Sequence, residues 1–478
     1  MLPAAWVYFA NALCWFSVAA SGRWPLVLLA LAPGLAFAAC GSAAIRNPEN
    51  RRLAHLAALA AAASALLTFP LLAAGHGAYF SVVFLASAAS WMIAGRAAAI
   101  PDAAGDLPSE SPVLWAHAGA DAAILGSFHL SLVRVPPGEL ARVREELTAA
   151  RSLCREAGWL DNPTTFHTPP SGLPDPLRST PRRSAGLRYE WLRAKSTYVP
   201  AAEACGALRW RARVRNRTTH AWWVPQENPD APWVICVHGF GLGRPLLDFH
   251  ALAARRLHRA HGCNLLFPVL ALHGPRARGV VSGDGFFSGD PVDTLNAVAQ
   301  SVHDIRHWLA WVLDRAHDPP AMFGVSLGAY LAALVAALEA GSGGDRIGRV
   351  LLGTPLVDIE EALWLHGPAF WHEAACEAGI NREDVRDLFR AISPLSLPPP
   401  AIPAAMFVAQ ADRLIPPGQA QDLARHWKDV QMARVPSAHV TYRLVPELRG
   451  VLRAHLPGGP SPTRAAGSRW DRSRGPMR

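Results

Sequence analysis

The chain has 478 residues, of which 51% are hydrophobic, and a formal net charge of +9. The length allows two to four domains, and a mean hydropathy of +0.13 indicates that part of the chain lies in a membrane. Lysine occurs only at Lys195 and Lys428, so arginine supplies most of the positive charge. Basic residues form no stripe interleaved with aromatic side chains, which sets nucleic-acid binding aside.

The first hundred residues consist mainly of apolar segments that contain no acidic or basic side chain except His55. Each segment is close to the length of about 17 to 25 residues that a helix needs to cross a bilayer. The sequence therefore predicts a transmembrane region of about four helices over residues 1–100, in these segments: Leu2 to Ser21, Pro25 to Ile45, Leu53 to Ala74 and Ala78 to Gly95.

The arginines predict how this region is oriented. Four of them fall in the connection between the second and third segments or directly after the fourth: Arg46, Arg51, Arg52 and Arg96. The other two connections carry only Arg23 and His76. The positive-inside rule then places both ends of the region, and the rest of the chain, in the cytoplasm. A secretory signal peptide at Met1 to Ser21 is the alternative, but no basic residue precedes its apolar run.

Residues 101–184 are predicted to form a linker and a soluble helical segment. Pro101 to Ser111 is polar and follows the last apolar segment. Val113 to Val135 is apolar again but contains Asp121, which argues against a fifth span; it is either an interfacial helix or a core helix of the next domain. Pro137 to Trp159 has a charged helical pattern, and several prolines after residue 161 indicate an extended connection.

Strands and helices alternate over residues 185–457, as expected for a domain with a largely parallel sheet. Arg188 to Tyr198 and Thr218 to Val224 are predicted to be its first strands. Trp233 to Val237 is continuously apolar, which is typical of a strand buried on both faces. The sequence His238-Gly239-Phe240-Gly241 follows this strand directly.

A G-x-S-x-G motif occupies Gly324 to Gly328, between a short apolar strand and an alanine-rich and leucine-rich helix. Ser326 would lie at the tip of the turn, where a non-glycine residue must adopt a strained backbone conformation. Gly324 and Gly328 must lack side chains so that the strand and the helix can approach each other.

An acid and a histidine follow this serine in the chain. Asp412 ends an apolar strand that begins at Met406, and His439 lies in a loop between a short strand and the last helix. Asp358 also follows a strand and is the alternative acid. The order serine, acid, histidine is one of the known chain orders of a catalytic triad.

Together these features, over about residues 231 to 457, resemble the α/β-hydrolase superfamily. The resemblance implies an α/β-hydrolase fold with Ser326 as nucleophile, Asp412 as acid and His439 as base. It also implies an oxyanion hole formed by the backbone N–H groups of Leu327 and Phe240. Residues 355–400 are an insertion that would form a cap, whose aromatic residues would give it an apolar underside.

The predicted function is therefore that of a membrane-anchored serine hydrolase that cleaves a carboxylic ester, such as a lipid ester, in the cytoplasm. The alternatives are an acyltransferase that uses the same acyl-enzyme, and a non-catalytic membrane scaffold on a hydrolase fold. No cofactor is expected, and the seven cysteines show no paired spacing that would suggest a zinc site. The basic segment 458–478 is predicted to be disordered.

Overall fold

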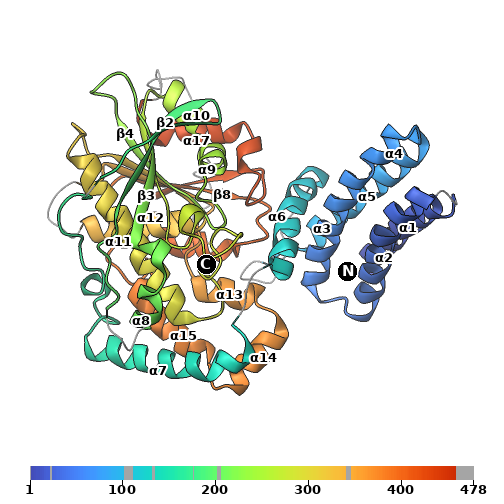
Figure 1. Ribbon diagram of the computed structural model, residues 1–478, viewed down its shortest axis with the longest axis horizontal. Helices are drawn as coiled ribbons and strands as arrows, with labels where there is room; N and C mark the ends of the chain where they lie inside the picture. Colours follow the sequence, from blue (N-terminus) through green and yellow to red (C-terminus); the bar gives the residue numbers. More distant parts are fainter. Residues whose placement is uncertain are drawn as a thin grey trace, which may run out of the picture.

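The computed structural model describes residues 2–21, 24–101, 111–131, 135–175, 177–201, 206–340 and 346–458. The predicted polar linker at Pro101 to Ser111 and the predicted disordered tail fall almost entirely outside these ranges. A set of N-terminal helices lies beside a larger α/β body, and helix α6 lies between the two (Figure 1).

The N-terminal region is entirely helical in its described part. Three segments there are long and apolar enough to cross a membrane: Trp24–Arg46, Arg51–Ala73 and Gly77–Ala97. The first predicted span also forms a helix but is not among these three, and the insertion of any of the helices into a membrane stays a prediction. Large apolar side chains such as Leu13, Leu66 and Leu85 are about two-thirds exposed, as expected of residues that face lipid. The helices are α1 (Leu2–Ala19), α2 (Trp24–Arg46), α3 (Arg51–Leu67), α4 (Phe69–Ala73) and α5 (Gly77–Ala97).

Helix α6 (Pro112–Ser131) packs against both α3 and α5. Glycines make this contact possible: a Cβ atom on Gly95 of α5 would lie 2.3 Å from the carbonyl oxygen of Trp115. A Cβ atom on Gly126 would lie 2.4 Å from the carbonyl oxygen of His55 in α3. Gly95 and His55 lie near the arginine-bearing ends of their helices, so α6 crosses the bundle at the end predicted to face the cytoplasm.

The α/β body is built on one nine-stranded sheet with the order β1-β2-β3-β5-β4-β6-β7-β8-β9. Strands β1, β2, β3 and β5 pair antiparallel, and the strands from β5 through β4 to β9 pair parallel. The predicted mostly parallel sheet is therefore confirmed. Its strands are β1 (Pro181–Ser184), β2 (Leu187–Lys195), β3 (Thr218–Val224), β4 (Trp233–Val237), β5 (Asn264–Pro268), β6 (Ala321–Val325), β7 (Arg349–Gly353), β8 (Ala404–Ala409) and β9 (Val430–Val435).

Helices cover both faces of this sheet (Figure 1). Successive strand residues such as Val234 and Ile235 belong to two different hydrophobic clusters, as the alternation of side chains along a strand requires. One face carries α7 (Leu140–Glu156), α11 (Pro291–Leu313), α12 (Leu327–Ala340) and α16 (Pro417–Trp427); the other carries α9 (Pro245–Ala251), α10 (Ala254–Arg259) and α17 (Glu447–His455).

The segment between β7 and β8 contains three helices, in the region where the sequence predicts a cap. They are α13 (Ile359–His366), α14 (Ala369–Glu377) and α15 (Arg382–Phe389). Of these, α15 packs against α7 and α13. A further short helix, α8 (Ala207–Arg211), precedes β3.

Candidate active site

Ser326 occupies the turn between β6 and α12 with a φ angle of +55°. This left-handed conformation is costly for a residue with a side chain, as the sequence predicts for a nucleophile elbow. A Cβ atom on Gly324 would lie 2.2 Å from the carbonyl oxygen of Gly328, and one on Gly328 would lie 2.1 Å from that of Val237. Both glycines are therefore required for strand β4, strand β6 and helix α12 to approach each other.

The strained turn is held by hydrogen bonds on both sides. The N–H of Ser326 donates to the carbonyl oxygen of Gly353 at the end of β7, at 2.9 Å. The carbonyl oxygen of Ser326 accepts from the N–H groups of Ala329 and Tyr330 in the first turn of α12. Sheet and helix thus over-determine the backbone at Ser326, which is the condition under which local strain persists.

His439 and Asp412 are in direct contact. Nδ1 of His439 lies 2.7 Å from Oδ2 of Asp412. The other oxygen of Asp412 accepts from the N–H groups of Leu414 and Ile415, each at 2.8 Å, so the carboxylate is fixed in place. With Nδ1 donating to Asp412, Nε2 is the basic nitrogen of the neutral imidazole. Burial alone would lower the pKa of His439, but the charge and hydrogen bond of Asp412 outweigh burial and raise the pKa.

Asp358, the alternative acid, has a different role. Its side chain accepts a hydrogen bond from the N–H of Glu361 at 3.0 Å and so caps the N-terminus of α13. Asp412, and not Asp358, is the carboxylate that contacts the imidazole.

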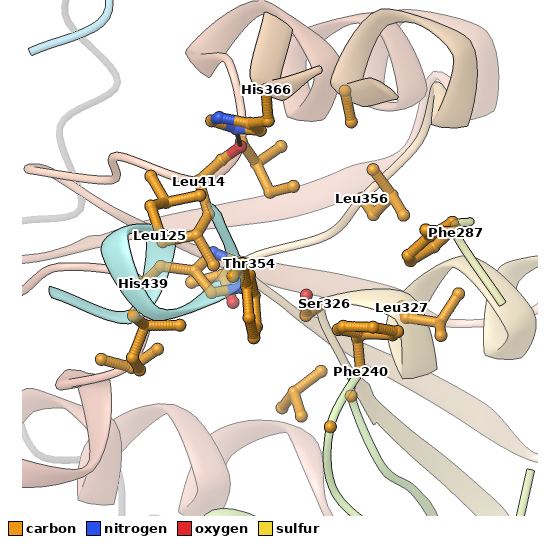
Figure 2. A pocket seen from close by; sticks show the side chains of 18 of the residues that line it. Leu125, Phe240, Phe287, Ser326, Leu327, Thr354, Leu356, His366, Leu414 and His439 are labelled. Atoms are coloured by element: carbon orange, nitrogen blue, oxygen red, sulfur yellow. Dashed lines mark hydrogen bonds between the residues drawn. The ribbon is translucent and has the colours of Figure 1, made fainter. Parts of the chain in front are cut away.

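Ser326 and His439 line the same cavity, which has a volume of about 480 Å³ (Figure 2). Most of the other lining side chains are aliphatic or aromatic. The structure therefore brings the predicted serine, histidine and acid to one rim of the sheet, beside a space of the size that small-molecule sites have.

Helices α13 and α6 supply much of the apolar wall. Ile359, Ala362 and Leu363 come from α13, while the α6 residues include Leu125 and Phe128. The expectation of an aromatic underside is wrong, because none of the tryptophans and phenylalanines of the insertion lines the cavity; aliphatic side chains and His366 do. Trp364, Trp371 and Phe389 pack into the hydrophobic core, and Phe370 is exposed.

The predicted oxyanion residues Phe240 and Leu327 also line the cavity. Leu327 is the first residue of α12, and the N–H groups of a first helical turn have no partner within the helix. The loop after β4 approaches the serine closely, since a Cβ atom on Gly239 would lie 3.4 Å from Cβ of Ser326. His238 is buried and fixes this loop: Nε2 accepts from the N–H of Leu270, and Nδ1 donates to the carbonyl oxygen of Gly239.

A second carboxylate, which the sequence did not assign to the site, lies next to His439. Asp121 of α6 is fully buried and accepts hydrogen bonds from the backbone N–H groups of Arg413, His439 and Val440, at 2.8 to 3.0 Å. Burial and the nearby charge of Asp412 raise the pKa of Asp121 to about 7. The available signal was a carboxylate within an otherwise apolar segment, which usually marks a functional position.

Three histidines gather at one end of the cavity. Nδ1 of His55 lies 3.0 Å from Nε2 of His129, and the rings of His55 and His366 are 6.4 Å apart. His129 and His366 line the cavity. Among the described residues, no group of three or more histidine, cysteine or acidic side chains has an arrangement that could hold a metal ion.

Comparison with known proteins identifies two relatives in Mycobacterium tuberculosis. The uncharacterized protein MT2702 is 31% identical over 329 residues, which cover 66% of this chain and 75% of the relative. The uncharacterized protein Rv2627c is 30% identical over 329 residues, which again cover 66% of this chain and 75% of the relative. No protein-family model matches the chain.

Solved structures with a similar arrangement include esterases of low sequence identity. The acetyl xylan esterase from Paenibacillus sp. R4 is 13% identical with a TM-score of 0.41, over 67% of this chain and all of that one. Est1E from Butyrivibrio proteoclasticus is 18% identical with a TM-score of 0.32, over 48% of this chain and 91% of that one. These TM-scores are too low to assign a function to the chain. Its fold is identified by its own sheet topology and by the strained turn at Ser326.

The sheet is mostly parallel and begins with antiparallel strands, and a strained serine lies between the central strand β6 and helix α12. This is the arrangement in which α/β-hydrolases present their nucleophile. The mycobacterial relatives match across three-quarters of their length. The chain therefore belongs to the same family as these two proteins, and by its fold it is a member of the α/β-hydrolase superfamily.

Proposed function

We propose that this protein is a serine hydrolase that cleaves a carboxylic ester through an acyl-enzyme on Ser326. The observation that carries the proposal is the strained Ser326 in one cavity with His439, whose imidazole is held by Asp412. A triad acts as a unit, because each member activates or orients the next.

In the proposed reaction, Nε2 of His439 takes the proton of the Ser326 hydroxyl while the oxygen attacks the acyl carbonyl. The N–H groups of Leu327 and Phe240 stabilise the charge that develops on the carbonyl oxygen. The imidazolium returns the proton to the leaving alcohol, and an acyl group remains on Ser326. His439 then deprotonates a water molecule, which attacks the acyl-enzyme and releases the carboxylic acid and the free serine.

The apolar walls of the cavity support a substrate with an apolar acyl group. Leu356, Leu363, Leu414 and Phe287 surround the space, and burial of each methylene in such a site is worth about 0.8 kcal/mol. The position of the cavity next to α6 supports a substrate from the membrane, such as a lipid ester, because α6 packs directly on the apolar helices.

The same arrangement supports a cytoplasmic location for the hydrolase domain. Helix α6 joins the bundle near Arg51 and Arg96, and positively charged residues at span ends favour the cytoplasmic side. We therefore propose a multi-pass membrane protein whose catalytic domain rests on the cytoplasmic end of its own helices.

A fluorophosphonate probe tests the central claim. The full-length protein in detergent or nanodiscs is expected to be labelled at Ser326, and Ser326→Ala is expected to show no labelling. A panel of p-nitrophenyl esters of increasing chain length then measures turnover, with the alanine variant as control. A wild-type protein that is folded but neither labelled nor active with any ester would contradict the proposal and favour a non-catalytic scaffold.

A further inference from the structure

One face of α6 is directed at the catalytic loops. The residues on this face recur every three or four positions, as one side of a helix requires. They are Leu114, Ala118, Asp121, Leu125 and Phe128. We call this set the α6 stripe.

Each end of the α6 stripe contacts a different part of the site. Leu114 and Ala118 are buried in a cluster with Ala411 and Ala438, the residues immediately before the acid and the histidine. Phe128, at the other end, stacks edge to face on Phe240 of the predicted oxyanion loop, with ring centroids 5.5 Å apart. Leu125 lies between these contacts and lines the cavity (Figure 2).

Asp121, at the centre of the α6 stripe, connects the two loops that carry the acid and the histidine. Its Oδ2 atom accepts from the N–H of Arg413 at 3.0 Å and from the N–H of His439 at 2.8 Å. Its Oδ1 atom accepts from the N–H of Val440 at 2.9 Å. One carboxylate thus fixes the backbone on both sides of the bond between His439 and Asp412.

The opposite face of α6 is fixed to the membrane-side helices. Gly119 and Gly126 lie so close to α5 and α3 that a Cβ atom on either would be within 2.4 Å of Trp91 or His55. The fully buried Arg413 extends the connection, because its Nε donates to the carbonyl oxygen of Gly95 in α5 at 2.9 Å. The acid loop therefore touches both α6 and the end of α5.

We propose that Asp121 is a positioning residue of the active site, through which α6 aligns Asp412 and His439 for catalysis. The inference rests on the proposed function of Ser326 and deepens it, because it makes the N-terminal helices part of the catalytic unit. Asp121 acts through His439 and Asp412. A displacement of about 1 Å in such an arrangement can cost roughly 10²-fold in rate.

Asp121→Asn is the direct test in the full-length protein. An amide has one acceptor oxygen and one NH₂ group, so it cannot accept from all three N–H groups at both positions. We expect kcat for a p-nitrophenyl ester and the rate of fluorophosphonate labelling to fall roughly 10²-fold, with KM within about threefold of wild type because the cavity walls remain.

A pH profile separates positioning from a general effect on folding. The charged groups that face His439 are Asp412, from the loop after β8, and Asp121, from α6; His366 of α13 faces Asp412 in turn. Asp121 raises the pKa of His439 where it is ionised, and its own pKa of about 7 means that it is only partly ionised over the acid limb of kcat/KM. Removal of this carboxyl is therefore expected to lower the midpoint of that limb modestly. Asp121→Glu keeps the charge while displacing the loops, so its midpoint is expected to stay close to wild type although its kcat falls.

Asp293→Asn is the matched control, since Asp293 is also a buried carboxylate but pairs with Arg209 and Arg213. Its kcat per labelled serine is expected to be that of wild type. Activities are normalised to the folded fraction, measured by circular dichroism and size exclusion. A folded Asp121→Asn protein with wild-type kcat and an unmoved acid limb would overturn the positioning role while leaving the proposed function intact. Failure of wild type itself to be labelled would overturn both.

Discussion

The Nδ1 atom of His439 lies 2.7 Å from Oδ2 of Asp412, although the two residues are 27 positions apart in the chain. The acid loop and the histidine loop follow the adjacent parallel strands β8 and β9, whose carboxyl ends lie at the same edge of the sheet. Ser326 reaches the same edge from β6, which is separated from β8 by the single strand β7. Strand order thus brings the three side chains together.

Asp412→Asn should lower kcat by about 10⁴-fold, because an amide stabilises the wrong imidazole tautomer and provides no charge for the imidazolium. The measurement is kcat with a p-nitrophenyl ester. Asp358→Asn is the control, since asparagine also caps helices well and kcat is expected to stay within twofold of wild type. The reverse ranking of the two variants would identify Asp358 as the acid.

The activity should depend on the protonation of His439. Catalysis needs the neutral imidazole, so kcat/KM falls as the pH drops through the pKa of this residue. Because Asp412 and Asp121 together raise that pKa against the effect of burial, the acid limb is expected to have its midpoint above the ordinary histidine value of about 6.5. A profile of kcat/KM between pH 5 and 9 checks this, and a midpoint well below 6.5 would contradict it.

Gly328→Ala should destabilise the fold, since its new methyl group would lie about 2.1 Å from the carbonyl oxygen of Val237 and force helix α12 away from β4. The expected loss is about 3 kcal/mol or more in the free energy of unfolding. Gly450→Ala in α17 is the matched control, because nothing lies within 4 Å of its Cβ position. It should stabilise the protein by about 0.5 to 1 kcal/mol. Thermal unfolding in detergent measures both, and equal melting temperatures for the two variants would argue against the tight elbow.

Leu363→Trp should shorten the range of accepted acyl chains, because the larger ring would occupy part of the cavity wall formed by α13. If three methylenes are displaced, the loss is roughly 2.4 kcal/mol, or about 50-fold in kcat/KM for a long-chain ester. Acetate esters should be affected little. Phe370→Trp, on the exposed surface of the same insertion, should leave the chain-length profile unchanged. An equal loss of kcat/KM for short-chain and long-chain esters would instead indicate a general disturbance of the site.

Cys376 provides a natural reporter of topology, because it is exposed in α14 while the other described cysteines are buried or half-buried. If the hydrolase domain faces the cytoplasm, a membrane-impermeant maleimide should label Cys376 only after the cells are permeabilised. Loss of the maleimide signal in the Cys376→Ser variant would assign the signal to this cysteine. Labelling of Cys376 in intact cells would place the domain on the other side of the membrane.

Much of the candidate site was predictable from the sequence because its signals are local. The elbow is a five-residue pattern between a strand and a helix, and each glycine in it meets a specific steric demand. The apolar run at Trp233 to Val237 and the order of Ser326, Asp412 and His439 likewise follow from the residues and their positions. For the same reason, the apolar N-terminal segments identified helices suited to a membrane.

The sequence could not decide which side of each helix faces the cavity. The insertion between β7 and β8 contains several tryptophan and phenylalanine residues, yet the rotation of α13 directs aliphatic side chains and His366 to the site and places Trp364 against the core. Asp358 and Asp412 both follow strands, and only the packing of the loops determines which one reaches His439.

By itself, then, the sequence determined the apolar helices suited to a membrane, the parallel sheet and the serine at its elbow, because short-range periodicity and turn geometry encode them. The tertiary structure alone decided which groups Asp121 binds: it accepts hydrogen bonds from backbone groups 292 to 319 positions away. Backbone N–H groups occur at every non-proline residue, so no side-chain pattern marks the ones that a distant carboxylate will bind. Only the packing of α6 between the bundle and the hydrolase body brings them together.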